Sequence, residues 1–280
     1  MKVERVYTKN AVYQKFEVLK TNRNKRHRYR EFFVEGVRNI NEAVRGGWPV
    51  HAFLYTKERP LSGWAQEMLA AVPVQTRYEL PYCLMRELSE KEDTSELLAV
   101  VGMRADRLED IELSDNPLLV LFDRPSNHGN LGTIIRSCDS LGINGLIITG
   151  HAVDPYAPEV ISASMGSFFH VPVVRAAENK SVFGFIDCLR QRYSGFQTVG
   201  TTAHRQTPLT QVDLKKPTLL MIGNETDGLC GAFKEKSDVL ATIPMSPRSS
   251  ASSFNVGCAA TVFFYEAVRQ RMQAQSCRED

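Results

Sequence analysis

Residues 118–138 read LLVLFDRPSNHGNLGTIIRSC, where an unbroken apolar run leads through a polar turn into a helix-like segment. A short, continuous apolar run is typical of a parallel strand that helices cover on both faces. Asn130 is expected to cap the helix that follows, with Asn127 and Gly129 shaping the turn before it. A helix that starts directly after a buried strand predicts an α/β sheet, and its N-terminus favours anions.

Apolar runs of the same kind recur along the rest of the chain, with helical segments between them. They are LIIT (146–149), VPVV (171–174), FQTVG (196–200), TLLMI (218–222) and VLATI (239–243). The segment 254–272 then places its apolar residues at helical spacing. This pattern predicts a three-layer α/β domain with a mostly parallel sheet over residues 117–280.

The first hundred residues predict a smaller α/β domain, assigned to residues 1–103. Its expected elements are a strand at 32–36, a helix at 37–47 stopped by Gly46 and Gly47, a strand at 51–56, a helix at 64–71, and strands at 72–76 and 97–101. Residues 104–116 are acidic, poor in periodic apolar residues and followed by Pro117, which is the composition of a linker.

The composition excludes several classes of protein. A chain of 280 residues with 43% hydrophobic and 24% charged residues is typical of a globular protein with two domains. No apolar run approaches the roughly 18 residues of a membrane span, and the N-terminus lacks the apolar core of a signal peptide, so we expect a cytoplasmic protein. The six cysteines show no Cys-x-x-Cys spacing, which argues against a zinc knuckle or a disulfide framework and predicts reduced, mostly buried thiols.

Charge is distributed unevenly along the chain. The net charge is only +2, yet the first 30 residues carry ten Lys and Arg residues against Glu4 and Glu17. The densest stretch, KTNRNKRHRYR (20–30), suits contact with a phosphate backbone, and a solvated basic helix or loop is the alternative. The candidate RNA-binding residues are Arg23, Lys25, Arg26, Arg28 and Arg30.

Three polar segments follow predicted strands at their carboxyl ends, where open α/β sheets bind ligands. They are residues 124–138, IGNETDGL (222–229) and IPMSPRSSASSFNVGCAATVFF (243–264). Gly223 at a strand end is expected to let a ligand approach the backbone. Taken singly, the three segments also fit a capped crossover helix, an ordinary strand exit, and a flexible connection with Ser253 as a helix cap. The second domain has no G-x-G-x-x-G, P-loop, H-E-x-x-H or G-x-S-x-G motif, which disfavours dehydrogenases and hydrolases.

Taken in order, these segments resemble the three motifs of the SpoU family of RNA 2′-O-ribose methyltransferases, which belongs to the SPOUT superfamily. The matching residues are N-x-x-x-x-x-R at 130–136, I-G-N-E-x-x-G-L at 222–229, and I-P-M with S-F-N-V between 243 and 256. Residues 30–100, with FFVEGVRNINEAV, are similar to the L30e-like substrate-binding domain. The resemblance implies a SPOUT α/β knot with a C-terminal deep trefoil knot, bound S-adenosylmethionine and a homodimer.

Position by position, the resemblance implies catalytic roles for Asn130, Arg136, Glu225, Ser253 and Asn255. Arg136 resembles the arginine proposed to help remove the ribose proton, but an ordinary arginine is a poor base because its pKa exceeds about 12. Orienting phosphate or stabilising a developing alkoxide is the alternative. The implied cofactor contacts are Thr201, Gly223, Asn224, Ile243, Met245, Ser253 and Phe254, although the family more usually has Leu at the position of Phe254. No metal is implied, since methyl transfer from a sulfonium needs alignment and proton removal.

The expected function is S-adenosylmethionine-dependent 2′-O-methylation of RNA. The additional N-terminal domain favours ribosomal RNA over tRNA as substrate. A non-catalytic RNA-binding or ribosome-assembly protein of the same fold is the alternative from another class. The motif residues are all present, which favours the enzyme.

Overall fold

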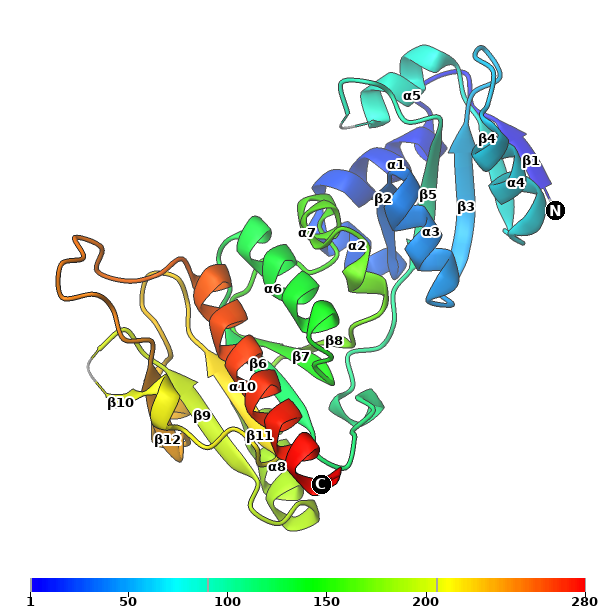
Figure 1. The fold of residues 1–280 in the computed structure, drawn as a ribbon. Coiled ribbons are helices and arrows are strands. Elements are labelled where there is room, and N and C mark those ends of the chain that lie inside the picture. Colours follow the sequence, from blue (N-terminus) through cyan, green and yellow to red (C-terminus); the bar gives the residue numbers. More distant parts are fainter. Residues whose placement is uncertain (1, 90, 205, 280) are drawn as a thin grey trace. The chain divides into compact units, whose positions relative to one another are not determined.

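The computed structural model describes residues 2–89, 91–204 and 206–279 (Figure 1). It divides into two compact units. The N-terminal unit comprises residues 1–104 together with 154–170, and the C-terminal unit comprises residues 105–153 together with 171–280. The segment 154–170 therefore packs within the N-terminal unit, although it follows the linker in sequence. The assignment of residues 104–116 as a linker between domains 1–103 and 117–280 stays a prediction.

The C-terminal unit is built on a seven-stranded sheet of order β10-β12-β9-β11-β6-β7-β8, and its recorded pairings are parallel. The strands are β6 (Leu118–Asp123), β7 (Gly145–Thr149), β8 (Val173–Ala176), β9 (Gln197–Thr201), β10 (Thr207–Pro208), β11 (Thr218–Ile222) and β12 (Val239–Thr242). Strands β6, β7 and β11 are buried at every residue, as parallel strands between two helical layers should be. The predicted α/β domain is confirmed.

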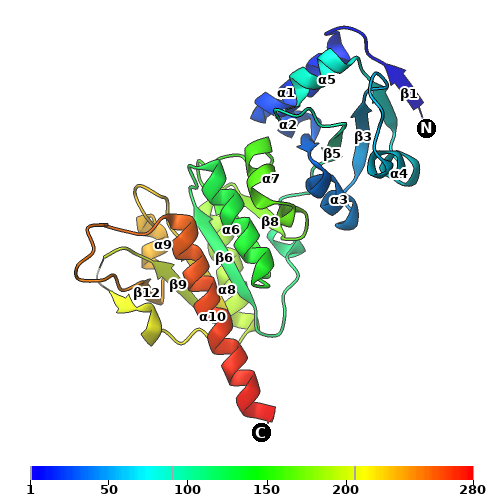
Figure 2. The ribbon, with the colours of Figure 1, turned by 45° about the horizontal axis from the view of Figure 1, so that its top comes forward.

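Helices cover both faces of this sheet. They are α6 (His128–Ser140), α8 (Asn179–Arg192), α9 (Gly231–Glu235) and α10 (Val256–Glu279). Figure 2 shows α6 and α10 side by side on one face and α8 on the other. Leu119 and Leu121 of β6 pack against Ile186 of α8 in a buried apolar cluster. No described helix is both long and apolar enough to cross a membrane.

The expected linker contributes to the core of the C-terminal unit. It contains a 3-10 turn, η1 (Leu108–Asp110), and the side chains of Leu108 and Ile111 are buried in the same cluster as β6 and α8. A Cβ built on Gly145 would lie only 2.8 Å from Ile111 Cγ2. The stretch has only three large apolar residues, Leu108, Ile111 and Leu113, which are too few to show periodicity, so composition alone could not predict this packing.

The N-terminal unit holds a five-stranded sheet of order β1-β4-β3-β5-β2. Its strands are β1 (Lys2–Arg5), β2 (Glu31–Glu35), β3 (Val50–Tyr55), β4 (Thr76–Glu79) and β5 (Leu97–Gly102). Its helices are α1 (Ala11–Thr21), α2 (Arg23–Tyr29), α3 (Val37–Arg45), α4 (Gly63–Ala71), α5 (Tyr82–Leu88) and α7 (Pro158–Ser164), with the turn η2 (Ser167–Phe169). The strand expected at 72–76 begins only at Thr76, because Val72 still donates to Met68 O at the end of α4 and Pro73 has no N–H.

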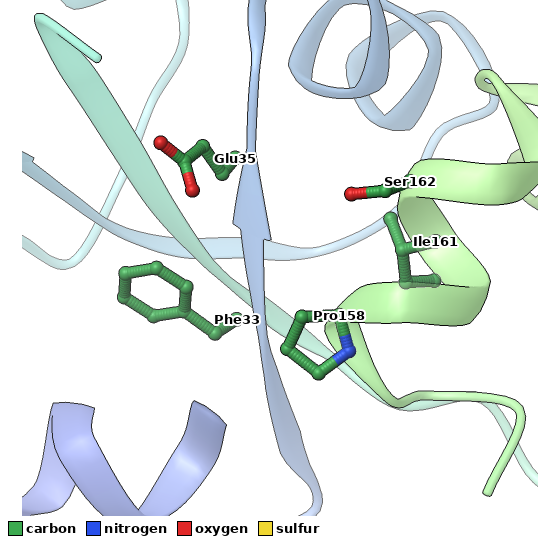
Figure 3. A pocket seen from close by; sticks show the side chains of 5 residues that line it. All are labelled: Phe33, Glu35, Pro158, Ile161 and Ser162. Atoms are coloured by element: carbon green, nitrogen blue, oxygen red, sulfur yellow. The ribbon is translucent and has the colours of Figure 1, made fainter. Parts of the chain in front are cut away.

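The segment 154–170 is held in the N-terminal unit by aromatic packing. Phe32 of β2 has its ring centroid 5.0 Å from that of Tyr156 and 6.0 Å from that of Phe168. Trp48 Nε1 donates a hydrogen bond of 2.8 Å to the carbonyl oxygen of Phe169. Between β2 and α7 there remains a cavity of only about 10 Å³, room for roughly one water (Figure 3). The segment is therefore part of this unit's core.

Candidate active site

The carboxyl ends of β6, β9, β11 and β12 lie at one edge of the sheet, because the strands are parallel and adjacent in the order given above. At this edge Ile222 pairs with Phe122, and Ala241 pairs with Thr201. The three polar segments named from sequence leave the sheet at these positions. Parallel pairing thus gathers residues that lie 40 to 100 positions apart in the chain.

Glu225 joins the loop after β11 to the loop after β6. Its Oε2 atom accepts hydrogen bonds from Ser126 N at 3.1 Å and from Ser126 Oγ at 2.7 Å. Its Oε1 atom accepts one from Asn130 Nδ2 at 3.2 Å. Ser126 was not predicted as a site residue. Its only signal in the sequence is its place in the turn between β6 and α6.

Asn127, and not Asn130 as expected, caps α6. Asn127 Oδ1 accepts a hydrogen bond of 2.9 Å from Asn130 N, the geometry of an N-cap with its third helical residue. The side chain of Asn130 is thereby left to bind Glu225 and Asn255. The expectation failed because both asparagines suit a cap and the sequence does not fix where the helix begins.

Asn255 connects the third motif to the first. Its Nδ2 atom donates to Asn130 Oδ1 at 3.1 Å, and its Oδ1 atom accepts from Gly257 N at 2.9 Å and Cys258 N at 3.3 Å. Asn255 therefore caps α10. Ser253 was the cap in the alternative interpretation of this segment as a flexible connection. Together, Ser126, Glu225, Asn130 and Asn255 form one hydrogen-bonded chain, which we call the amide–carboxylate network.

The charge state of Glu225 follows from its surroundings. Partial burial raises the pKa of Glu225, but hydrogen bonds from Ser126, from the backbone and from Asn130 outweigh that effect. The pKa therefore lies below its ordinary value, and the side chain is a carboxylate at neutral pH. An ionised carboxylate only accepts hydrogen bonds, so Glu225 is suited to orienting Ser126 and Asn130 rather than to donating a proton.

Arg136 lies apart from the amide–carboxylate network. It is exposed and stands six residues after Asn130 on α6, which corresponds to a rise of about 9 Å along the helix. No hydrogen bond between Arg136 and the network is recorded among the described residues. The structure therefore brings together Asn130, Glu225 and Asn255 but not Arg136, so Arg136 is free to meet a bound molecule or a second chain.

The loop after β11 is shaped by its own backbone. A Cβ built on Gly223 would lie 2.1 Å from Leu229 N and 2.3 Å from Gly228 C. Gly223 is thus needed for the approach of residues 228–229, and the approach of a ligand to its backbone stays a prediction. Asn224 is also occupied, since its Nδ2 atom donates to Arg124 O at 2.6 Å and its Oδ1 atom accepts from Thr226 N at 2.8 Å. Only the backbone of these two residues remains as a candidate cofactor contact.

The other candidate cofactor residues lie at the same edge of the sheet. Thr201 ends β9, while Ile243 and Met245 follow β12, and all three are half-buried. Ser253 and Phe254 are exposed in the loop before α10, where the side chain of Phe254 is 46% exposed. An exposed hydroxyl, an exposed aromatic ring and a half-buried thioether on adjacent loops suit a polar molecule with one planar ring.

Two residues beside the network support the loops without having been predicted. Asp123, at the buried end of β6, accepts hydrogen bonds from Thr149 Oγ1 at 3.0 Å and from Cys230 N at 2.9 Å. Arg124 adopts a left-handed conformation with φ of 53°, and its Nη2 atom donates to Gly228 O at 3.0 Å. Gly150 makes room for it, since a Cβ there would lie 2.5 Å from Arg124 Cγ.

The cysteines do not follow the expectation of mostly buried thiols. Of the five whose surroundings are described, only Cys138 is buried; Cys230 is half-buried, and Cys83, Cys188 and Cys258 are exposed. Among the described residues, no group of three or more His, Cys, Asp or Glu side chains is placed to hold a metal ion.

Arg26 is turned into the interior of the N-terminal unit. It is 4% exposed, and its Nε atom lies 2.7 Å from Asp154 Oδ2. Its Nη1 atom donates to the carbonyl oxygens of Leu19 at 3.0 Å and Lys20 at 2.7 Å. The guanidinium is buried and bound inside the unit, so Arg26 is corrected from an RNA contact to a structural residue.

The other basic residues of α2 differ in exposure. Arg28 is exposed, and Lys25 and Arg23 are half-buried. Arg30 is exposed, and its Nη2 atom donates to the carbonyl oxygen of Arg104 at 2.7 Å. Arg28 and Arg30 therefore present charge to the solvent, as an RNA-binding surface requires.

Comparisons with known proteins identify relatives over the whole chain. Residues 117–265 match the model of the SpoU rRNA Methylase family, and residues 10–99 match that of the SpoU L30e-like domain. The 23S rRNA (uridine(2479)-2'-O)-methyltransferase of Streptomyces viridochromogenes is 44% identical over 97% of this chain and 94% of its own.

Solved structures give the same picture. The SpoU methyltransferase AviRb of Streptomyces viridochromogenes, in complex with the cofactor AdoMet, matches with a TM-score of 0.89 and 45% identity over 94% of this chain and 98% of that one. The AdoMet-bound rRNA methyltransferase of Sinorhizobium meliloti matches with a TM-score of 0.80 and 28% identity over 95% and 98% of the two chains. The fold of both units is therefore shared with proteins solved in complex with that cofactor.

The pH dependence of stability tests the state of Glu225. Because its folded-state pKa lies below the ordinary value of 4.5, its contribution is fully present above that pH and is lost as the pH falls through the folded value. We expect Glu225→Gln to lower the free energy of unfolding by about 1–3 kcal/mol at neutral pH. The difference from wild type should shrink as the pH falls below 4.5, as measured by urea unfolding with circular dichroism.

Glu235→Gln is the matched control, because Glu235 is an exposed carboxylate on α9 in the same unit. It should have little effect at either pH. A Glu225→Gln deficit that stays constant from neutral to acid pH would contradict the inference that the network depends on an ionised Glu225.

Replacing Arg26 tests its structural role. Arg26→Met leaves Asp154 buried without its guanidinium partner and is expected to cost about 3–5 kcal/mol of stability. Arg28→Met, on the same helix but exposed, should change stability by about 0.5 kcal/mol or less. The chain has two tryptophans, Trp48 and Trp64, so their fluorescence during urea unfolding reports on the N-terminal unit. Equal losses in the free energy of unfolding for the two variants would contradict the structural role of Arg26.

Proposed function

The chain belongs to the SpoU rRNA methylase family, and on that premise we propose that it methylates the 2′-hydroxyl of a ribose in ribosomal RNA with S-adenosylmethionine as methyl donor. Membership confirms the resemblance drawn from the three motifs. The observation that carries the proposal is the amide–carboxylate network, which joins one polar residue from each of the three motifs, Asn130, Glu225 and Asn255, at the carboxyl edge of the sheet.

Ribosomal RNA is proposed as the substrate because the similarity to the Streptomyces 23S rRNA methyltransferase extends through both units. A relative that shared only the C-terminal unit would leave the choice of RNA open, since the reaction at the ribose is the same for any RNA. The separate match of residues 10–99 to the SpoU L30e-like domain supports a substrate-binding role for the N-terminal unit. tRNA is the competing substrate, and the experiment below distinguishes the two.

The candidate cofactor residues at the sheet edge fit S-adenosylmethionine. Phe254 offers an exposed ring, Ser253 an exposed hydroxyl, and Thr201, Ile243 and Met245 half-buried strand ends. Gly223 and Asn224 contribute backbone groups only. The cofactor supplies an electrophilic methyl group, so what remains for the protein is to orient the ribose and to manage the proton of its 2′-hydroxyl.

We propose that the amide–carboxylate network positions the substrate. Glu225 fixes Asn130 and Ser126, while Asn255 fixes the other side of the Asn130 amide, so the loops after β6, β11 and β12 keep a constant spacing. Ser253, two residues before Asn255, presents its hydroxyl at the same edge. A preformed arrangement of polar groups costs no reorganisation during the reaction.

Arg136 is proposed to stabilise the negative charge that develops on the ribose oxygen. Arginine acts in proteins as a cation that donates hydrogen bonds, so an electrostatic role is physically preferable to that of a free base. Its exposure and its distance along α6 from Asn130 suit contact with an RNA held against that helix.

A homodimer built on α6 and α10 is proposed as the active form. Gly257, at the start of α10, would place a Cβ 3.2 Å from Thr133 Cγ2, so the two helices approach closely there. Next to this contact, α10 exposes apolar side chains, with Val262 41% and Tyr265 59% exposed. Apolar residues on a helix beside a candidate site are typical of an interface between subunits.

The proposed RNA-binding surface comprises Arg23, Lys25, Arg28 and Arg30 on and after α2, with Arg26 removed for the reason given above. We place the protein in the cytoplasm as part of the same proposal. Bacterial ribosomal RNA is available there, and nothing in the proposed reaction requires a membrane.

Methyl transfer tests the proposed function directly. Labelled methyl from S-adenosylmethionine should appear as a 2′-O-methylnucleoside in the 23S rRNA fraction of RNA from cells lacking this protein. Arg136→Ala should lower kcat by about 10²–10³-fold, the usual effect of removing one group that stabilises a developing oxyanion. The affinity for S-adenosylmethionine, measured by calorimetry, should not change.

Arg192→Ala is the control, because Arg192 is an exposed arginine on α8. It should retain normal transfer. Label in the tRNA fraction alone would replace the proposed substrate. Cofactor binding in calorimetry with no transfer to any RNA would favour the non-catalytic RNA-binding alternative.

A further inference from the structure

A cavity of about 450 Å³ lies within the N-terminal unit, among β3, α4, α5 and the segment before β5. This volume falls within the roughly 300–1,000 Å³ typical of sites for small organic ligands. Its lining combines planar, cationic and hydroxyl-bearing side chains, among them Arg59, Trp64, Tyr82, Lys91 and Thr94. None of these residues belongs to the sheet edge described above.

A planar stack forms one part of the lining. The guanidinium carbon of Arg59 lies 3.7 Å from the centroid of the Tyr82 ring. Tyr82 is fixed at both ends, since its hydroxyl donates to Thr94 Oγ1 at 3.2 Å and its backbone N–H donates to Glu58 Oε2 at 2.7 Å. A guanidinium stacked on a held ring offers a flat, electron-poor surface to another planar group.

A second aromatic side chain lines the cavity and is also held in place. Trp64 Nε1 donates to Asn41 Oδ1 at 2.8 Å, which fixes the orientation of the indole. Beside it, Ser62 donates to Glu96 through its backbone N–H at 2.7 Å and its hydroxyl at 2.6 Å. These bonds fasten the loop after β3 to the segment before β5, so the aromatic part of the lining is preformed.

One ammonium group and two carboxylates complete the lining. Lys91 is exposed, and its Nζ atom lies 3.1 Å from the position of a Cβ built on Gly36, whose φ is +95°. Any larger residue at Gly36 would displace this ammonium. Of the carboxylates in the lining, Glu96 is bound by Ser62, while Asp93 is exposed and can accept hydrogen bonds from amino groups.

We propose that this cavity binds one unstacked nucleotide of the RNA substrate. Stacking on aromatic rings and arginine planes, together with hydrogen bonds to exposed base edges, is the chemistry by which proteins recognise single-stranded RNA. The base stacks on the Arg59–Tyr82 pair and Trp64, and its phosphate lies near Lys91. This assignment rests on the proposed RNA substrate and gives the N-terminal unit a site that selects an RNA loop.

Filter binding of a 23S rRNA transcript, with no methyl transfer required, tests the site. The double variant Arg59→Ala/Lys91→Ala should weaken the Kd for the transcript by about 10-fold, as expected for loss of stacking on one base. Calorimetric affinity for S-adenosylmethionine should remain that of the wild type. In steady-state transfer, KM for the RNA should rise while kcat stays unchanged.

The matched control is Lys57→Ala/Arg86→Ala, which removes the same charge from exposed positions in the same unit that do not line the cavity. Equal weakening by both double variants would overturn the proposal in favour of general attraction to phosphates. Unchanged RNA binding would also overturn it.

A free nucleotide could be bound by the same groups, so free adenosine and uridine monophosphates are tested as ligands. If they quench Trp64 fluorescence at micromolar concentration while both double variants bind RNA like the wild type, the cavity holds a free nucleotide and not the substrate. Filter binding and fluorescence quenching do not depend on methyl transfer. An absence of transfer to rRNA would therefore contradict the proposed function, while these two measurements would still decide the nucleotide site.

Discussion

The carboxylate of Glu225 is the interaction on which the candidate site depends. It binds Ser126 and Asn130, and Asn130 in turn binds Asn255, so one ionised group fixes the loops after three strands. The parallel sheet makes this possible, because it brings the ends of β6, β11 and β12 to one edge. Without the carboxylate, Ser126 and Asn130 would retain no common acceptor, and the loops would lose their fixed spacing.

The two compact units are not continuous in sequence, and this has consequences for how the protein is divided. The segment 154–170, between β7 and β8, buries Tyr156 and Phe168 against Phe32 of the N-terminal unit. It also brings Asp154, which neutralises the buried Arg26. A fragment cut at the linker would expose these aromatic rings and leave Arg26 without its partner.

Much of the C-terminal fold could be predicted, because continuous apolar runs such as LLVLF identify buried parallel strands. The site was predicted less completely. Asn130 and Glu225 were identified through the motifs, but which asparagine caps α6 depends on where the helix begins, and the sequence fits both. The burial of Arg26 depends on Asp154, which lies 128 positions away and leaves no local signal. The constraint on Gly223 is local, since residues 228–229 turn back onto it, but the motif does not show how closely they approach.

A double-mutant cycle between Asn130 and Glu225, read out as kcat for methyl transfer to 23S rRNA, tests the central claim that these residues act as one unit. Asn130→Ala and Glu225→Ala should each lower kcat, and the double variant should lose little more than the worse single variant. Losses that multiply in the double variant would show that the two side chains act independently, and would contradict a single positioning network.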